Sequence, residues 1–171
     1  MNHQELRLAI LHRVISELDD VGKTQMQKLG YFLQEALGVP TKYHFRMHHY
    51  GPYSDGLDTD MTRLRLTGYI DIQHDPQGYG FHITSTDDNL PEEWEGLIED
   101  YDELIDYVIR AFGNRKPAEL ELAATIHFVN NLAPSASKEE ILKTVKALKP
   151  KFLEPYIQSH YSRLEKAGLL E

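Results

Sequence analysis

The sequence predicts a mainly α-helical protein built on a winged helix-turn-helix, with a C-terminal helical half packed on it. Three observations support this fold class. Apolar residues with helical spacing lie on both sides of an aromatic segment between residues 24 and 67, an alternating pattern follows over 70–83, and a longer helical pattern begins at residue 91. Helix, helix and hairpin in this order are the ground plan of a winged helix-turn-helix. We expect a winged-helix module at 1–85 and a helical subdomain at 91–171.

Two helices are predicted at the start of the chain. Residues 2–18 contain apolar side chains at helical spacing, namely Leu11, Val14, Ile15 and Leu18. Thr24 and Gln27 have the spacing of a capping box, in which each side chain satisfies a free backbone N–H at the start of a helix. The second helix should therefore begin at Thr24. It should end at Gly38 and Pro40, because glycine accepts the left-handed conformation and proline cannot continue a helix.

An aromatic segment connects the second helix to a third. Residues 43–53 predict a short strand followed by a turn, because a Gly-Pro pair breaks the aromatic run. Ser54 or Asp55 can then cap the third helix, which should end at Gly68. Its buried side chains should be Leu57, Met61 and Leu64.

A β-hairpin, the wing, is predicted after the third helix. Its alternating side chains are Ile70, Ile72 and His74 on one strand and Tyr79, Phe81 and Ile83 on the other. Residues 75–78, Asp-Pro-Gln-Gly, separate the two strands and are typical of a β-turn with proline at its second position.

The strongest helical period covers residues 91–112. Its apolar stripe is anchored by Trp94, Tyr101 and Phe112. Eight acidic residues lie outside the stripe: Glu92, Glu93, Glu95, Glu99, Asp100, Asp102, Glu103 and Asp106. This pattern predicts either a buried stripe with a solvated acidic face or a homodimer formed through this helix.

Three further helices are expected at 117–132, 138–148 and 153–167, and Ser137 and Glu140 form a capping box for the middle one. A possible internal repeat concerns the ends of the third and last helices. Residues 63–70 and 163–170 share Arg-Leu, three variable residues, Gly and two apolar residues. We hypothesise that the second half is a degenerate copy of the first three helices. The alternative is convergence, because Arg-Leu before a glycine is ordinary helix-ending chemistry.

Composition restricts the function. The 171-residue chain is 41% hydrophobic and 26% charged, as in soluble globular proteins, and it has no cysteine for a disulfide, a thiolate nucleophile or a metal site. Residues 1–20 carry charges throughout and no apolar run approaches a membrane span, so we expect a cytoplasmic protein without a membrane interaction. The net charge is −9, of which 86–171 carries −7. An acidic chain is a poor candidate for DNA binding, which draws affinity from neutralised phosphates.

Two blocks of sequence resemble a known family. Lys28, Leu29, Tyr31 and Phe32 form one block, and residues 50–54 form a Tyr-Gly-Pro-Tyr-Ser block that Leu57 extends. These blocks resemble the YwgA-like family of uncharacterised microbial proteins and, more remotely, the Panacea antitoxin domains. The resemblance implies a winged-helix-like fold and, for the antitoxin relatives, neutralisation of a toxin by binding it. It supplies no catalytic residues.

The aromatic and histidine-rich segment is the main candidate site. We expect a non-catalytic regulatory module that binds a protein partner, with antitoxin-like action as one possibility, and uses no cofactor. The expected binding surface consists of Tyr43, His44, Arg46, His48, His49, Tyr50 and Tyr53. Aromatic side chains here have an alternative role, which is to pack the loop between two helices.

Two other functions are kept as alternatives. A DNA-binding winged-helix transcriptional regulator would use Lys42, Arg46, Arg63, Arg65, His74 and His82, with Lys23 and Lys28 nearby. Against it, the third helix begins with Asp55, Asp58 and Asp60, where groove-reading helices present neutral or cationic side chains. A metal-dependent hydrolase would need His44, His48 and His49 as ligands. In an extended segment His49 faces away from the other two, so no metal is expected.

Overall fold

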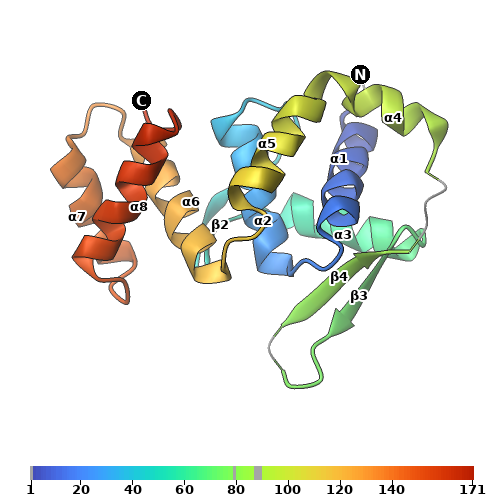
Figure 1. The fold of residues 1–171 in the computed structure, drawn as a ribbon, viewed down its shortest axis with the longest axis horizontal. Coiled ribbons are helices and arrows are strands. Elements are labelled where there is room, and N and C mark those ends of the chain that lie inside the picture. Colours follow the sequence, from blue (N-terminus) through green and yellow to red (C-terminus); the bar gives the residue numbers. More distant parts are fainter. Residues whose placement is uncertain (1, 79, 87–89) are drawn as a thin grey trace.

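The structure, a computed structural model, describes residues 2–78, 80–86 and 90–171. In these ranges the protein is mainly helical, with two small antiparallel hairpins (Figure 1). The helices are α1 (His3–Leu18), α2 (Lys23–Tyr31), α3 (Asp55–Leu66), α4 (Glu92–Ile98), α5 (Asp102–Phe112), α6 (Pro117–Leu132), α7 (Lys138–Leu148) and α8 (Glu154–Lys166). A π-helical turn, η1 (Phe32–Ala36), extends α2, and a 3₁₀ turn, η2 (Glu99–Tyr101), joins α4 to α5. The strands are β1 (Arg46–His48), β2 (Gly51–Tyr53), β3 (Ile70–His74) and β4 (Phe81–Ser85).

Most of the predicted helices are confirmed within one or two residues. Ser54 caps α3, because its Oγ accepts a hydrogen bond from Leu57 N at 3.4 Å. The capping box of α7 is also present: Glu140 N donates to Ser137 Oγ at 3.2 Å, and Ser137 N donates to Glu140 Oε2 at 3.0 Å. The three buried positions expected on α3, Leu57, Met61 and Leu64, are fully buried.

The predicted capping box of α2 is wrong, although the helix begins within one residue of the predicted start. The helix begins at Lys23 with Gly22 as its N-cap, and Gly22 N donates to Gln25 Oε1 at 3.4 Å. Thr24 therefore lies inside the first turn. Gln27 is buried and takes part in a contact across the fold, described below. The predicted end is confirmed, since Gly38 has a φ of +75° and its N–H donates to Gln34 O.

The aromatic segment forms a tight hairpin where one strand and a turn were expected. Arg46 pairs with Tyr53 and His48 pairs with Gly51, so the turn consists of His49 and Tyr50. The Gly-Pro pair was expected to break the strand, but it lies within β2. Proline is tolerated because this sheet has two strands, and the Pro52 carbonyl still accepts a side-chain hydrogen bond.

The second hairpin is confirmed. β3 and β4 pair in register from Ile70 with Ser85 to His74 with Phe81, and Gly78 N donates to Asp75 O at 2.9 Å across the turn. Tyr79, which was assigned to the return strand, lies outside the described residues. Val21 forms a β-bridge with Ile83, which fixes the base of the hairpin while its turn projects from the helices (Figure 1).

The predicted helix at 91–112 is interrupted. It consists of α4 and α5 with η2 between them, so the chain bends. Its apolar stripe packs inside the chain: Trp94 and Phe112 are buried, and Phe112 stacks on Phe32 with the ring centroids 4.1 Å apart. Arg13 on α1 forms ion pairs with Asp102 and Asp106 of α5 at 2.8 and 3.1 Å. Two of the three anchors assigned to a second subunit are thus covered within the chain, and Tyr101 is half-buried, so the homodimer stays a prediction that Trp94 and Phe112 do not support.

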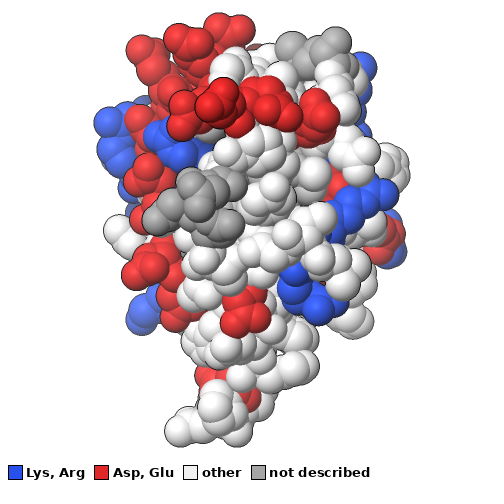
Figure 2. Space-filling model, turned by 90° about the vertical axis from the view of Figure 1, so that its right-hand side faces the viewer, with Lys and Arg blue, Asp and Glu red and all other residues white. Residues whose placement is uncertain are grey.

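The acidic side chains of α4 remain on the surface. Figure 2 shows Asp and Glu side chains gathered over this helix, on the face that also carries the projecting hairpin. Glu92, Glu93 and Glu95 are exposed in its first turn, where the positive end of the helix dipole favours carboxylates. The prediction of an exposed acidic face is confirmed there.

Helix α6 connects the two parts of the fold. It contacts α2 and β2 on one side and α7 and α8 on the other, so the last two helices lie across α6 from the projecting hairpin (Figure 1). The buried apolar residues form one continuous cluster from Leu6 to Leu164. No helix in the described ranges combines the length and apolar character that a bilayer crossing requires.

The similar ends of α3 and α8 form the same backbone motif. Gly68 and Gly168 have φ values of +85° and +72°, and Tyr69 N and Leu169 N donate to Leu64 O and Leu164 O, respectively. This is the helix-ending hydrogen-bond pattern that convergence predicts. The repeat therefore stays a hypothesis.

A substitution at Gly30 tests how closely α2 and α3 approach each other. A Cβ at Gly30 would collide with Leu57 Cδ1, and Leu57 is fully buried, so its side chain has no free space to enter. We expect Gly30→Ala to lower the free energy of unfolding by about 1–2 kcal/mol, because overpacking outweighs the gain in helix propensity.

The matched control is Gly96→Ala on α4, where no atom lies within 4 Å of the added Cβ. This variant should be as stable as the parent or more stable by up to about 1 kcal/mol. Chemical denaturation of both variants measures the difference. Equal stabilities for the two would contradict the close approach of α2 and α3.

Candidate functional site

The two sequence blocks meet in the interior. Lys28 Nζ donates a hydrogen bond to Pro52 O at 2.8 Å. The side-chain amide of the neighbouring Gln27 forms two hydrogen bonds with the backbone of Ser54. Its Nε2 donates to Ser54 O at 2.9 Å, and its Oε1 accepts from Ser54 N at 2.8 Å. Helix α2 thus holds strand β2 and the start of α3 through buried side-chain to backbone hydrogen bonds. Such bonds satisfy buried backbone groups that a two-stranded sheet leaves without partners.

The remaining residues of the first block contact other elements. Tyr31 OH lies 2.8 Å from His127 Nδ1 of α6, and its ring packs edge-on against Phe45. Burial lowers the pKa of His127 to about 4, so this imidazole is neutral at neutral pH. Phe32 stacks on α5, and Gly30 admits Leu57 of α3. The block therefore acts as a junction for packing.

Gly51 is required at this junction. Its φ is +93°, and a Cβ there would meet Lys28 Cε at 3.2 Å, Glu121 O at 3.2 Å and Thr125 Oγ1 at 3.3 Å. A side chain would be disfavoured both by the backbone conformation and by contact with α2 and α6. The glycine lets β2 lie directly against these two helices.

Two lysine side chains form ion pairs with one buried carboxylate beside this junction, and a third lies near it. Lys149 Nζ lies 3.0 Å from Glu121 Oε1, and Lys151 Nζ lies 2.9 Å from Glu121 Oε2. The contact to Oε1 is an ion pair without hydrogen-bond alignment, so Oε1 accepts no hydrogen bond from the described residues. Lys28 is the third cation, close enough to interact with both Glu121 and Lys149. The cluster carries a surplus of positive charge.

Burial of Lys28 changes its titration. Desolvation lowers the pKa of Lys28 from its usual 10.5 to about 8; Glu121 partly opposes this change, and Lys149 adds to it. Among the described residues, no carboxylate lies within ion-pair distance of Lys28, and its ammonium group is held by the Pro52 carbonyl. The assignment of Lys28 to phosphate contacts is therefore wrong, because its side chain is inaccessible.

The tip of the β1–β2 hairpin lies against the end of α7. Lys149 Nζ donates to His48 O at 3.2 Å and to His49 O at 2.5 Å, which fixes the backbone of the turn. A pocket of about 520 Å³ opens here, lined by Met47, His48, His49, Glu121, Leu148, Lys149, Pro150 and Lys151. Tyr50, 60% exposed, lies at its edge, with Lys151 Nζ 5.8 Å from the ring centroid. We call His48, His49, Tyr50, Leu148 and Lys151 the tip surface.

The predicted binding residues divide between surface and interior. His48, His49 and Tyr50 are exposed on the tip surface, whereas Tyr43 is buried. Of the others, His44 and Arg46 are exposed, and Tyr53 is half-buried with its ring 5.2 Å from that of His48. The expected surface is thus smaller than seven residues, since the alternation that exposes His44 turns Tyr43 inward.

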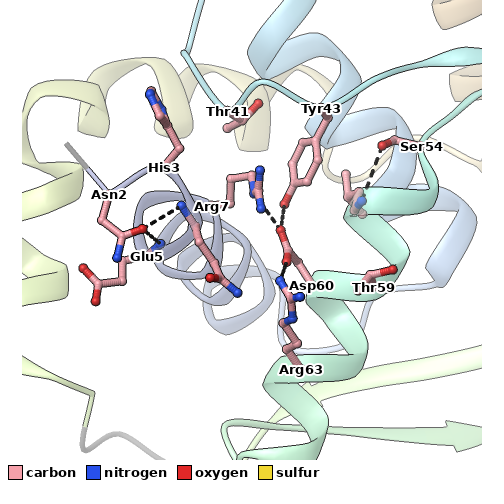
Figure 3. Close-up of polar contacts among 12 residues, drawn as sticks. Asn2, His3, Glu5, Arg7, Thr41, Tyr43, Ser54, Thr59, Asp60 and Arg63 are labelled. Carbon is pink, nitrogen blue, oxygen red and sulfur yellow. Dashed lines mark hydrogen bonds and ion pairs between the residues drawn. The ribbon is translucent and has the colours of Figure 1, made fainter.

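Tyr43 belongs to a buried polar network around Asp60 (Figure 3). Asp60 Oδ2 accepts from Tyr43 OH and Arg7 Nε, both at 2.8 Å, and Asp60 Oδ1 accepts from Arg63 at 3.1 Å. Burial, and then the Asp60 charge, raise the pKa of Tyr43. All three donors bind the same carboxylate, so the network connects α1, α3 and the segment before β1. We interpret these ion pairs as structural.

Half of the predicted DNA contacts are already paired with carboxylates. Arg63 pairs with Asp60, Arg46 pairs with Asp55 at 3.3 Å, and His82 lies 3.0 Å from Asp20. The other three, Lys42, Arg65 and His74, are exposed and form no ion pair in the described ranges. Lys23 lies 3.9 Å from Asp58.

The histidines proposed as metal ligands do not converge. His44 precedes β1, and the rings of His48 and His49 are 5.4 Å apart and nearly perpendicular. Within the described ranges, no three His, Asp or Glu side chains are grouped so that they could hold a metal ion.

Sequence reasoning missed the C-terminal side of this site. Glu121, Leu148, Lys149 and Lys151 were not singled out. A signal was present for Glu121, the only charged residue in the apolar run 120–129, which predicts a helix buried on most sides. Nothing in the sequence indicates that residues 148–151 return to the β1–β2 hairpin.

Titration of Lys28 gives a pH-dependent stability. Between pH 8 and 10 the unfolded chain holds a proton on Lys28 that the folded chain has lost, so the free energy of unfolding should rise with pH. Relative to Lys28→Met, the parent should gain about 2–3 kcal/mol between pH 7.5 and pH 10. Denaturation at several pH values measures this difference, with Lys143→Met at an exposed site as the control. Parallel curves for the parent and Lys28→Met would contradict a lowered pKa.

The chain resembles known proteins over most of its length. No protein-family model matches it. It is 28% identical to a protein of Thermus aquaticus named DNA ADP-ribosyl glycohydrolase; the match covers 96% of this chain but 46% of that protein, so the chain spans about half of its length. It is 26% identical to the uncharacterised protein YwgA of Bacillus subtilis, over 81% of this chain and 83% of YwgA. The resemblance to the YwgA-like family, expected from two short blocks, therefore extends over most of the chain.

Proposed function

We propose that this chain is a non-catalytic regulatory module that binds a protein partner through the tip surface. The observation that carries the proposal is an exposed aromatic and aliphatic patch on a fixed backbone. Tyr50 is 60% exposed and Leu148 is 45% exposed, while Lys149 holds the turn between them. Tyrosine is enriched among residues that dominate binding energy at interfaces, and a backbone ordered beforehand loses less entropy on binding.

The similarity to YwgA covers 81% of this chain but brings no activity with it, since YwgA is uncharacterised. The winged-helix interpretation fits the order α1, α2, α3, β3 and β4, with the projecting hairpin as the wing. Winged-helix modules bind nucleic acid or protein more often than they catalyse, and an antitoxin-like role would be one form of such binding.

The name of the Thermus protein raises a glycohydrolase as a second candidate. Glycoside hydrolysis commonly uses two carboxyl groups on either side of the scissile bond. The pocket at the tip surface is lined by one carboxyl group, Glu121, which is occupied by Lys149 and Lys151. Because the match covers less than half of the Thermus protein, we assign its activity to no residue of this chain.

Affinity capture from the cell of origin tests the proposal. The parent chain should retain a protein in stoichiometric amount, and Tyr50→Ala with Leu148→Ala should weaken retention at least tenfold, because each truncation of an interface anchor removes about 1–2 kcal/mol. Both side chains are exposed, so thermal stability should change little.

The matched control is Leu132→Ala. Leu132 is 71% exposed on α6 and lies eleven residues from Glu121, about 16 Å along the helix axis. It should retain the partner as the parent does. Retention that the double variant leaves unchanged would refute binding through the tip surface.

DNA binding remains the alternative, and the projecting hairpin favours it. Arg65 on α3 is the cleanest probe, because it is exposed and forms no ion pair in the described ranges, whereas Arg63 supports buried Asp60. For a protein-binding module, Arg65→Ala should change affinity for duplex DNA less than twofold. Fluorescence anisotropy at several salt concentrations measures it. Loss of about 1–3 kcal/mol of affinity, or a salt slope reduced by about 1, would show that Arg65 contacts a base or a phosphate.

A further inference from the structure

The pocket at the tip surface has a local charge opposite to that of the chain. The net charge of the chain is −9. At the pocket, Lys149 and Lys151 line the wall, Lys28 lies close to Glu121 behind it, and Glu121 is the one carboxylate among the lining residues. Three ammonium groups stand against one carboxylate, and the positive potential that this surplus creates favours an anion from outside.

The donors that remain for a ligand can be identified. Lys149 is buried and already engaged, since its Nζ donates to His48 O and His49 O and pairs with Glu121. Lys151 Nζ contacts one protein oxygen, Glu121 Oε2, and its side chain is 54% exposed. The rings of His48 and His49 are exposed and form no hydrogen bond with the described residues. Lys151 and the two histidines therefore present free N–H donors at the mouth of the pocket.

The pocket also has an apolar wall. Met47, Leu148 and Pro150 line it, and the exposed ring of Tyr50 lies beside Lys151. A ligand that fits both parts carries a carboxylate next to an aliphatic or aromatic group. Consecutive residues of an acidic protein segment present these groups a few ångströms apart.

We propose that the pocket receives a glutamate or aspartate side chain from an acidic segment of the partner protein, with a neighbouring apolar side chain on Leu148 and Tyr50. This inference rests on the proposed function and names the chemistry of the partner. Nucleic acid fits less well, because its affinity comes from many phosphate contacts along a basic face, and among the lysines of this pocket only Lys151 is exposed to a ligand.

The probe is an acetylated and amidated hexapeptide with the repeat Glu-Glu-Leu. Its control is the same peptide with Gln in place of Glu. In ¹H–¹⁵N NMR titrations at millimolar concentration, the glutamate peptide should shift the amide signals of residues 47–49 and of Lys149 and Lys151. The glutamine peptide should bind at least tenfold more weakly, because it lacks the charge that the ammonium groups attract.

Charge variants distinguish binding in the pocket from an effect of the net charge of the chain. Lys151→Gln removes the charge and keeps a donor for Glu121, and Lys151→Glu reverses it; we expect losses of about threefold and at least tenfold in affinity for the glutamate peptide. Lys166→Glu, at an exposed site in the last turn of α8, changes the net charge by the same amount and should have less than a twofold effect. Thermal melts confirm that Lys151→Gln is folded.

Several outcomes would overturn the inference. Equal affinity for the glutamate and glutamine peptides, or shifts of amide signals away from the pocket, would show that the pocket does not bind a carboxylate. Equal losses of affinity for Lys151→Glu and Lys166→Glu would show that the peptide responds to the net charge of the chain and not to the pocket. Tighter binding of duplex DNA that depends on Lys151 would assign the pocket to phosphate. If no peptide binds while capture still depends on Tyr50, this inference fails alone; if capture is also independent of Tyr50, the proposed function fails too.

Discussion

The fold depends on the contacts that helix α2 makes through a few buried polar side chains. Gln27 and Lys28 hold the backbone of β2 and the first residue before α3, and Tyr31 reaches His127 on α6. Unpaired backbone groups in the interior cost roughly as much as a lost hydrogen bond, so these side chains specify where the short hairpin lies. A sheet of two three-residue strands is too small to fix its own place against α2 and α6, so these side chains and Lys149 determine it.

This constraint explains the two sequence blocks. They look like a binding motif, because aromatic, basic and glycine residues are concentrated in them. In the structure Lys28, Tyr31 and Gly51 face inward, and each contacts a different neighbour. The residues available to a partner are those that the turn exposes, His49 and Tyr50, which lie at the start of the second block or just before it. The two sequence blocks therefore form the packed interior that positions the tip surface.

Local sequence patterns predicted the helices because caps and apolar spacing act within a few residues. Ser137 and Glu140 satisfy each other's N–H groups, and Gly38 ends its helix by its own conformation. A local pattern gave a wrong prediction where its side chain forms a long-range contact instead. Gln27 has the right spacing for a capping box, but it binds Ser54, 27 residues away. The break between α4 and α5 and the contact of Lys149 with His49 are likewise tertiary, so no local period contains them.

The site combines two features that are seldom stable together, a buried carboxylate and an excess of buried lysine. Glu121 neutralises one positive charge, and the backbone carbonyls of His48, His49 and Pro52 accept hydrogen bonds from the buried Lys149 and Lys28, while Lys151 is exposed. Carbonyl dipoles solvate a cation without cancelling its charge, so the positive potential persists at the mouth of the pocket while the interior stays satisfied. The same lysine that fixes the turn therefore also contributes to its potential. Because Lys151 is the one exposed lysine of the cluster, this arrangement would favour a single anionic side chain over an extended polyanion.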